Sequence, residues 1–317
     1  MGIFLLRRAG FLILALFLAS IIIFGATQLL PGDVATVVLG QFATEAAIAN
    51  LQAELGLDRP AYIQYLDWAG GFIRGDWGYS MVSRMPVRPI VMERLQSSVM
   101  LAALAFFFYV PLGVILGIIA AIKREKVADR LITGVSMAFV GLPEFVTGLL
   151  LISFIALGAN LLPANSSIEP GHGFIEALPY LILPAITVSL TSLGYVARMV
   201  RSGTIEVLRT DYVRAAELKG LPARIVLFRH VLRNALLPTI TVVAMGIGWL
   251  LGGLIVTEQV FGYPGLGRIL IFSIQRGDLP MIQAATMVIV AIFLLANMAA
   301  DILYSVLNPR IRAGSRQ

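Results

Sequence analysis

Side chains that could do chemistry are scarce in the long apolar segments of this sequence. Glu144 is the one carboxylate near the middle of such a segment, and it directly follows the helix-breaking Pro143. If the segment crosses a membrane, a carboxylate there is costly and should face a water-filled cavity or a partner group. Glu144 could then line a transport pathway or relay protons. The alternative is a neutral Glu144, or one that hydrogen-bonds to backbone groups that Pro143 leaves free.

Cysteine and histidine, the residue types most often used in zinc sites and in nucleophile–base pairs, are absent or scarce. Cys does not occur, and His172 and His230 are too far apart in sequence to indicate a metal cluster. The phosphate-binding pattern G-x-x-x-x-G-K-[ST], the zinc-protease pattern H-E-x-x-H and the nucleophile pattern G-x-S-x-G are all missing. These absences argue against an enzyme. One carboxylate without a second charged group gives only weak support to a proton relay.

The apolar segments that carry these residues are long enough to cross a membrane. Hydrophobic residues make up 58% of the 317 residues and charged residues 13%, whereas soluble domains carry about 25% charged residues. Uninterrupted apolar blocks, rather than alternating or 3.6-residue patterns, predict membrane-spanning helices. We therefore predict an all-α membrane protein, a single transmembrane domain over residues 1–317. The six predicted transmembrane helices cover about residues 9–30, 97–122, 131–157, 178–196, 236–257 and 281–307.

The basic residues predict the orientation of these helices. Most of the 24 Lys and Arg residues fall in the N-terminal segment, the loop after the second helix, the 197–235 loop and the C-terminal segment. The positive-inside rule therefore places both termini in the cytoplasm, and the net charge of +6 requires no nucleic-acid partner. Arg7 and Arg8 precede the first apolar run, as in a signal peptide. That run is longer than the usual apolar region of about 7–15 residues, so we predict a retained helix.

The outer loop, residues 31–96, is predicted to contain two amphipathic helices. Thr44 can cap the first, which would end at Gly56, and the second would begin near Asp58 and Pro60. The apolar residues expected on one side are Ile48, Leu51 and Leu55 in the first helix, and Tyr62, Leu66, Ala69 and Ile73 in the second. Such helices are typical of the membrane interface or of a cover on the helix bundle.

A short, charged helix is predicted in the cytoplasmic 197–235 loop, within DYVRAAELKGLP at residues 211–222. Asp211 can accept a hydrogen bond from a first-turn N–H group. Lys219 suits the negative end of the helix dipole, and Gly220 permits a left-handed turn. A helix of about eight residues is not stable alone in water, so it needs a surface to hold it. The alternative is a solvated basic loop, which would explain the arginines but not the cap and the glycine together.

The same stretch resembles the cytoplasmic EAA loop of ABC importer permeases. Arg214-Ala215-Ala216 stands for Glu-Ala-Ala, Gly220 falls at the family's spacing, and Leu237-Pro238 closes the loop. Arg214 replaces the family's Glu, so no carboxylate role carries over to that position. The longer gap before Pro238 is similar to the dipeptide/oligopeptide/nickel branch. Four further stretches resemble that branch: TQLLPGD at 27–33, RGDWGYS at 74–80, VTEQVFGYPGLGRIL at 256–270 and DILYSVLNPRIR at 301–312.

The resemblance implies a permease subunit of a binding-protein-dependent importer in the bacterial inner membrane. A second, similar permease would form the other half of the pathway, a substrate-binding protein would deliver the solute outside, and two separate ATPase subunits would bind ATP and Mg. This chain would need no cofactor of its own. The short cytoplasmic helix would dock into a cleft of an ATPase, with Ala215 and Ala216 forming a smooth patch against it. The residues assigned to this coupling are Asp211, Tyr212, Arg214, Ala215, Ala216, Lys219, Gly220 and Arg224.

In the family the translocation pathway lies among the inner helices, which are the second to fifth spans here. The candidate lining residues are Glu144, Thr187, Ser189, Thr191 and Ser192. Ser and Thr also join helices by hydrogen bonds, which is the alternative role of each. An outer scoop near the binding protein, or else a tight Gly/Pro loop, is expected from Thr257, Glu258, Tyr263 and Pro264.

Peptides are the default cargo of this branch, with nickel, sugars and opine conjugates as further alternatives. The competing function is an ion-coupled secondary transporter, which would work without an ATPase and respond to a proton or sodium gradient.

Overall fold

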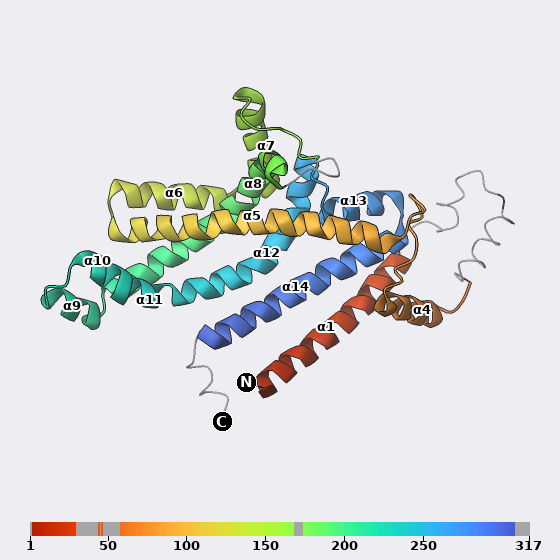
Figure 1. Cartoon of the computed structure of the whole chain (residues 1–317), viewed down its shortest axis with the longest axis horizontal. Coiled ribbons are helices and arrows are strands. Elements are labelled where there is room, and N and C mark those ends of the chain that lie inside the picture. The colour runs from red at the N-terminus through yellow and green to blue at the C-terminus, as the bar shows by residue number, and fades with distance from the viewer. Residues whose placement is uncertain (1, 30–43, 45, 47–57, 168–173, 308–317) are drawn as a thin grey trace. The chain divides into compact units, whose positions relative to one another are not determined.

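The computed structural model describes residues 2–29, 44, 46, 58–167 and 174–307 (Figure 1). Within these ranges the regular structure is helical, apart from one isolated bridge between Tyr79 and Pro86. The α-helices are α1 (Gly2–Gln28), α4 (Ala61–Arg74), α5 (Val87–Ile122), α6 (Val127–Gly141), α7 (Glu144–Leu151), α8 (Phe174–Leu208), α9 (Asp211–Leu218), α10 (Ala223–Ile225), α11 (Leu232–Ala235), α12 (Leu237–Phe261), α13 (Leu266–Arg276) and α14 (Leu279–Leu307). Two π-helical segments are η1 (Ile152–Gly158) and η2 (Val226–Val231). The all-α prediction is confirmed for the described residues.

Four of these helices are long and apolar enough to cross a membrane, namely α1, α5, α8 and α14. The pair formed by α6 and α7–η1 also meets this test but bends by 110° at its break. Pro143 explains the bend, since it cannot continue a helix and holds the preceding Leu142 in an extended conformation. The structure thus supports four spans, or five if the bent pair is one. The predicted 236–257 span coincides with α12 and stays a predicted span, as does the predicted orientation.

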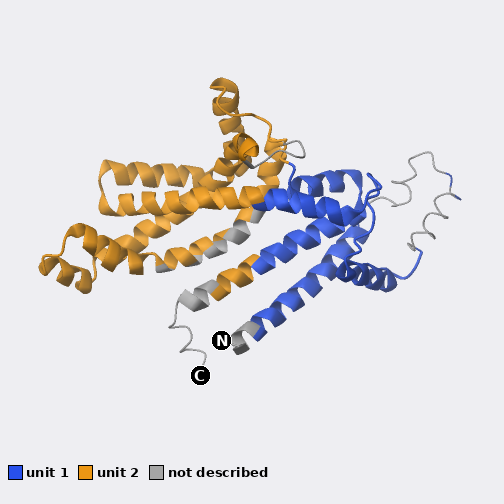
Figure 2. Ribbon diagram, viewed as in Figure 1, with its two compact units in different colours: residues 1–99, 264–295 blue, residues 100–263, 296–317 orange. Residues whose placement is uncertain are grey.

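The chain divides into two compact units (Figure 2). Unit 1 comprises residues 1–99 and 264–295, and unit 2 comprises residues 100–263 and 296–317. Helices α5 and α14 each contribute residues to both units.

In unit 1 an aromatic ladder packs α4 against α1. Phe24 lies 5.6 Å from Tyr65 and 5.8 Å from Trp68 between ring centroids, and the ladder continues through Phe72 to the stacked ring of Trp77. Such ring pairs add to the free energy gained from burying apolar area. The amphipathic helix predicted after Pro60 is therefore present, but an aromatic face holds it in place.

The other face of α4 is exposed and carries Tyr62, Leu66 and Ile73, three of the apolar residues predicted to share one side. This arrangement fits a helix at the membrane interface. The helix predicted over residues 44–56 lies almost entirely outside the described residues.

The RGDWGYS stretch forms a turn within unit 1. Asp278, which is buried, accepts a hydrogen bond from the Ser80 hydroxyl and one of 3.1 Å from the Met81 N–H. Trp77 Nε1 donates to the Phe72 carbonyl at 3.1 Å. The two bonds to Asp278 fix the segment between α4 and α5 against the start of α14, and the Trp77 bond ties the same segment to the end of α4.

Unit 2 is built around α8, which packs against α6 and α12. Small residues allow α5 and α6 to approach it closely. A Cβ atom built on Gly117 of α5 would lie 2.6 Å from the Ala197 carbonyl oxygen, and one on Gly194 of α8 would lie 2.7 Å from that of Ser136 on α6. These glycines therefore serve helix packing.

Candidate functional site

The start of the short helix in the 197–235 loop differs from the prediction. The residue before α9 is Thr210, and Asp211 is the first helical residue rather than the cap. The Thr210 hydroxyl donates to the Val207 carbonyl at 2.6 Å, and no side chain caps the first turn. Asp211 still places a negative charge in the first turn, which suits the positive end of the helix dipole.

The end of α9 has the geometry predicted for Gly220. Its φ angle is +75°, its N–H donates to the Glu217 carbonyl at 2.9 Å, and the Leu221 N–H donates to the Ala216 carbonyl at 3.4 Å. This pair of bonds around a left-handed residue is the Schellman motif, which satisfies carbonyls left free at a helix end. Lys219 lies one residue past the last helical position.

We expect Gly220→Val to loosen this helix. A Cβ atom at position 220 would meet nothing within 4 Å, so the cost is conformational: a left-handed residue with a side chain loses about 1–2 kcal/mol. Amides of α9 should then exchange with deuterium about 5- to 30-fold faster. Gly220→Asn is the matched control, because Asn tolerates this conformation. Equal exchange rates in the two variants would contradict the assignment.

The inner side of α9 packs against its own chain. Val213 and Ala216 are buried with Val226, Val231 and Ala235 of the returning segment. Ala216 is only 5% exposed, so of the two alanines expected to form a patch for a partner, Ala215 alone is at the surface of this chain. The Tyr212 hydroxyl accepts a 2.9 Å hydrogen bond from Asn234 and so adds a polar tie. The surface that an eight-residue helix requires is thus supplied within the loop.

The outer side of the same loop exposes apolar side chains. Leu218 is 84% exposed. We use the term loop-tip residues for Ala215, Leu218, Leu221, Ile225 and Phe228, all of them exposed. Arg214, Lys219 and Arg224 are exposed beside them in sequence. Exposed apolar side chains with charged neighbours are typical of a site for another macromolecule.

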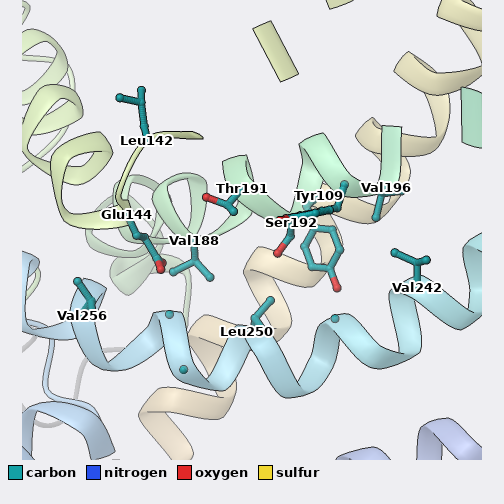
Figure 3. Close-up of a pocket in the computed structure, with 14 residues that line it drawn as sticks. Tyr109, Leu142, Glu144, Val188, Thr191, Ser192, Val196, Val242, Leu250 and Val256 are labelled. Carbon is teal, nitrogen blue, oxygen red and sulfur yellow. The ribbon is translucent and has the colours of Figure 1, made fainter. Parts of the chain in front are cut away.

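A cavity of about 620 Å³ lies in unit 2 among α5, α7, α8 and α12 (Figure 3). Its volume falls in the range of about 300–1,000 Å³ that small-molecule sites occupy. The lining is mostly apolar. The lining residues are Tyr109, Leu142, Glu144, Val188, Thr191, Ser192, Tyr195, Val196, Val242, Gly246, Leu250, Gly252, Gly253 and Val256.

Three of the five predicted pathway residues line this cavity: Glu144, Thr191 and Ser192. The other two are buried elsewhere. The Thr187 hydroxyl donates to the Leu183 carbonyl of its own helix at 2.9 Å. The Ser189 hydroxyl contacts the Ala185 carbonyl at 2.5 Å and that of Ala105 on α5 at 3.0 Å. Ser189 therefore joins α8 to α5, which is the alternative role, whereas Thr187 bonds only within its own helix.

Glu144 is held at the cavity by α12. The Thr257 hydroxyl donates to Glu144 Oε1 at 2.9 Å. Gly253 leaves the space that the carboxylate occupies, because a Cβ atom there would lie 2.5 Å from Oε2. Glu144 forms no salt bridge with any described residue. The geometry thus presents a carboxylate with one neutral donor to an apolar cavity.

Of the residues expected to form an outer scoop, Thr257 and Glu258 belong to the last turns of α12, and Tyr263 and Pro264 belong to the tight turn that follows it. Thr257, Glu258 and Tyr263 are buried. The Tyr263 N–H donates to the Glu258 carbonyl at 2.9 Å across Gly262, which has a φ angle of +65°. This arrangement matches the Gly/Pro turn that was the alternative, and it leaves only Pro264 of the set partly exposed.

Sequence reasoning missed an ion pair at the start of α6. Arg201 of α8 donates two hydrogen bonds to Asp129, at 2.6 Å from Nε and 2.7 Å from Nη2. Asp129 also accepts from the Glu125 N–H at 2.9 Å and from the Thr133 hydroxyl at 3.2 Å. This bidentate geometry is the strong form of a carboxylate–guanidinium contact. Its partners are 72 positions apart, so no local pattern indicates the pair.

Tyr109 was also missed. Its ring lines the cavity, yet its hydroxyl is buried and has no hydrogen-bond partner in the described part of the chain. The residue lies inside an apolar block, where periodicity cannot distinguish a core tyrosine from a lining one.

The described residues contain no cluster of three or more side chains suited to hold a metal ion.

Comparison with known proteins covers nearly the whole chain. Residues 113–313 match the family "Binding-protein-dependent transport system inner membrane component", and residues 1–102 match the family "Binding-prot-dependent transport system membrane comp, N-term". The probable peptide ABC transporter permease protein y4tP of Sinorhizobium fredii is 35% identical over 98% of this chain and 100% of its own length. The dipeptide transport system permease protein DppB of Escherichia coli is 36% identical over 98% of both chains. The glutathione transport system permease protein GsiC of Escherichia coli is 35% identical over 98% of both chains.

These matches agree with the apolar helices and favour a permease over the ion-coupled alternative. The chain belongs to the binding-protein-dependent transport system inner membrane component family, and it is a multi-pass permease of the bacterial inner membrane rather than an enzyme.

Proposed function

We propose that this chain is half of the translocation pathway of an ATP-driven importer for peptides or similar small solutes. Its relatives are named for peptide, dipeptide and glutathione transport, which supports this cargo class. A second, similar permease completes the pathway, and an extracytoplasmic binding protein delivers the solute. Two separate ATPase subunits bind ATP and Mg. The chain is a single permease domain with six spans, α12 being the fifth, and with both termini in the cytoplasm.

The solute passes along the 620 Å³ cavity, lined by Glu144, Thr191 and Ser192. The lining comes from α5, α7, α8 and α12, so relative movement of these helices changes the shape of the cavity. Rigid-body movement of packed helices is a common means of transmitting a conformational change.

The 197–235 loop couples this movement to an ATPase. The observation that carries this proposal is the exposure of Leu218 on a short helix whose other side is packed against its own chain. The docking face therefore consists of the loop-tip residues together with exposed Tyr212, with Arg214, Lys219 and Arg224 orienting the encounter. Ala216 and Gly220 shape the loop rather than contact the partner.

A crosslinking experiment tests this assignment. Because the sequence contains no Cys, an introduced cysteine is the only thiol of this chain that can react. Leu218→Cys, expressed with the partner subunits in native membranes, should crosslink to the ATPase, and ATP should change the yield. Ala216→Cys is the matched control and should give no adduct, because position 216 is buried. The coupling proposal fails if the cysteine at 218 reacts with a water-soluble maleimide yet never forms an adduct with the ATPase.

A further inference from the structure

We propose that Glu144 binds the ammonium group of the transported solute inside the cavity. This inference rests on the proposed function, because it assigns a chemical role to one group of the proposed pathway. It also narrows the cargo: a solute with a free amine fits, whereas a neutral sugar does not.

Glu144 lacks a positively charged partner among the described residues. Thr257 gives it one neutral hydrogen bond to Oε1, and no described residue forms a salt bridge with it. A carboxylate in an apolar surrounding is stable only when it is paired with a charge or neutralised. An ammonium group supplies a positive charge and three N–H donors. The other carboxylate oxygen, Oε2, lies against Gly253 and can accept a hydrogen bond from such a donor.

The second step concerns Tyr109. Its side chain is 1% exposed, its hydroxyl has no partner among the described residues, and it lines the same cavity as Glu144 (Figure 3). A buried hydroxyl without a partner carries a cost that a ligand can remove. A hydroxyl can donate to a carbonyl or a carboxylate. In this structure the Tyr109 ring forms part of the cavity wall, and its hydroxyl would reach a solute only after the surrounding helices move.

The third step concerns the length of the site. In Figure 3 the labelled lining residues of α8 form a row. Glu144 of α7 lies at one end of this row, and Val196 of α8 lies at the other. The lining stretch of α8 from Val188 to Tyr195 covers about 10 Å at 1.5 Å per residue. An extended chain spans about 3.3–3.6 Å per residue, so two or three residues fit along it.

The rest of the cavity lining is mostly apolar. Arg198 contacts the ring of the lining residue Tyr195, with 5.0 Å between its guanidinium carbon and the ring centroid, but it is outside the lining. Glu144 is therefore the one charged residue among the described residues of the lining. The apolar walls suit aliphatic side chains, and together these features match a short peptide with a free N-terminus.

The test uses the complete importer, reconstituted in vesicles with its partner permease, ATPases and binding protein. ATP-driven uptake of a dipeptide is compared with uptake of its des-amino analogue, in which hydrogen replaces the ammonium group. Glu144→Gln should slow uptake of the dipeptide about tenfold more than it slows uptake of the analogue. The binding protein is the same in both vesicle preparations, so its own selectivity cancels when the two permeases are compared.

Gly253→Ala provides a second variant that keeps the carboxyl group. Its methyl group would displace the Glu144 carboxylate, so dipeptide uptake should fall more than analogue uptake. Gly134→Ala is the matched control, because a Cβ atom there meets nothing within 4 Å and the residue lies outside the cavity lining. Unchanged selectivity in both Glu144→Gln and Gly253→Ala would overturn the ammonium assignment and leave the importer proposal standing. Failure of the unmodified complex to take up any peptide with ATP would overturn the proposed function itself.

Discussion

Arg201→Ala should lower the free energy of unfolding by about 3 kcal/mol, the lower end of the range for breaking a buried ion pair. The variant leaves Asp129, which is 3% exposed, without its bidentate partner. The Glu125 N–H and the Thr133 hydroxyl remain, but they supply no positive charge. We choose the lower end because the Arg201 side chain is 29% exposed, so water partly screens the pair.

Unfolding of the purified protein in detergent, followed by denaturant titration, measures this effect. Arg130→Ala is the matched control, because Arg130 is exposed and should change stability by no more than about 0.5 kcal/mol. The double variant Asp129→Ala/Arg201→Ala should be more stable than Arg201→Ala alone, since it removes the uncompensated charge. If Arg201→Ala and Arg130→Ala behave alike, the ion pair contributes nothing to the fold.

The Asp129–Arg201 pair shows that counting charges along the sequence does not reveal which charged side chains contact each other. Counting Arg201 among the basic residues of a cytoplasmic loop supports an orientation, and that use treats every Arg as solvated. The structure places Arg201 within α8 and pairs it with Asp129 on α6. Side-chain pairing between distant helices depends on how the helices pack, and one sequence does not contain that information in any local pattern.

Sequence patterns predicted the structure correctly where backbone sterics and hydrogen bonds between neighbouring residues determine it. The helix break at Pro143, the left-handed Gly220 and the short helix over residues 211–218 follow from backbone sterics and hydrogen bonding. They failed for the faces of that helix. Val213 and Ala216 are buried while Ala215 and Leu218 are exposed, although both pairs are apolar and spaced for one face. The returning segment, residues 226–235, and the end of α8 at Val207 and Leu208 determine which pair is covered.

The candidate site was predictable in part for a related reason. An acidic residue in an apolar block indicates a cavity or a partner, and Glu144 does line a cavity. Hydroxyl residues on α8 carry no such signal, because an isolated Ser or Thr can bond to its own helix, as Thr187 does. Gly253 and Thr257 act on Glu144 from α12, more than a hundred positions away in the sequence.

Gly117→Ala should destabilise the protein by about 1–3 kcal/mol, although alanine is the better helix former. Gly113 and Gly117 place two small residues on one side of α5, against Val196, Ala197 and Val200 of α8. A methyl group at position 117 would lie 2.6 Å from both the Ala197 carbonyl oxygen and the Val200 Cβ atom. Neither is the far end of a flexible side chain, so the helices themselves must move apart.

The control variant is expected to change the stability of the protein in the opposite direction, so the two variants are easily distinguished. Gly134→Ala adds the same methyl group to α6, where nothing lies within 4 Å, and should stabilise the protein by up to about 1 kcal/mol through helix propensity alone. Thermal unfolding in detergent should therefore place Gly117→Ala below the unmodified protein and Gly134→Ala at or above it. A Gly117→Ala variant as stable as Gly134→Ala would show that α5 and α8 are not in close contact. Because both helices line the cavity, such a result would also remove one wall of the proposed pathway.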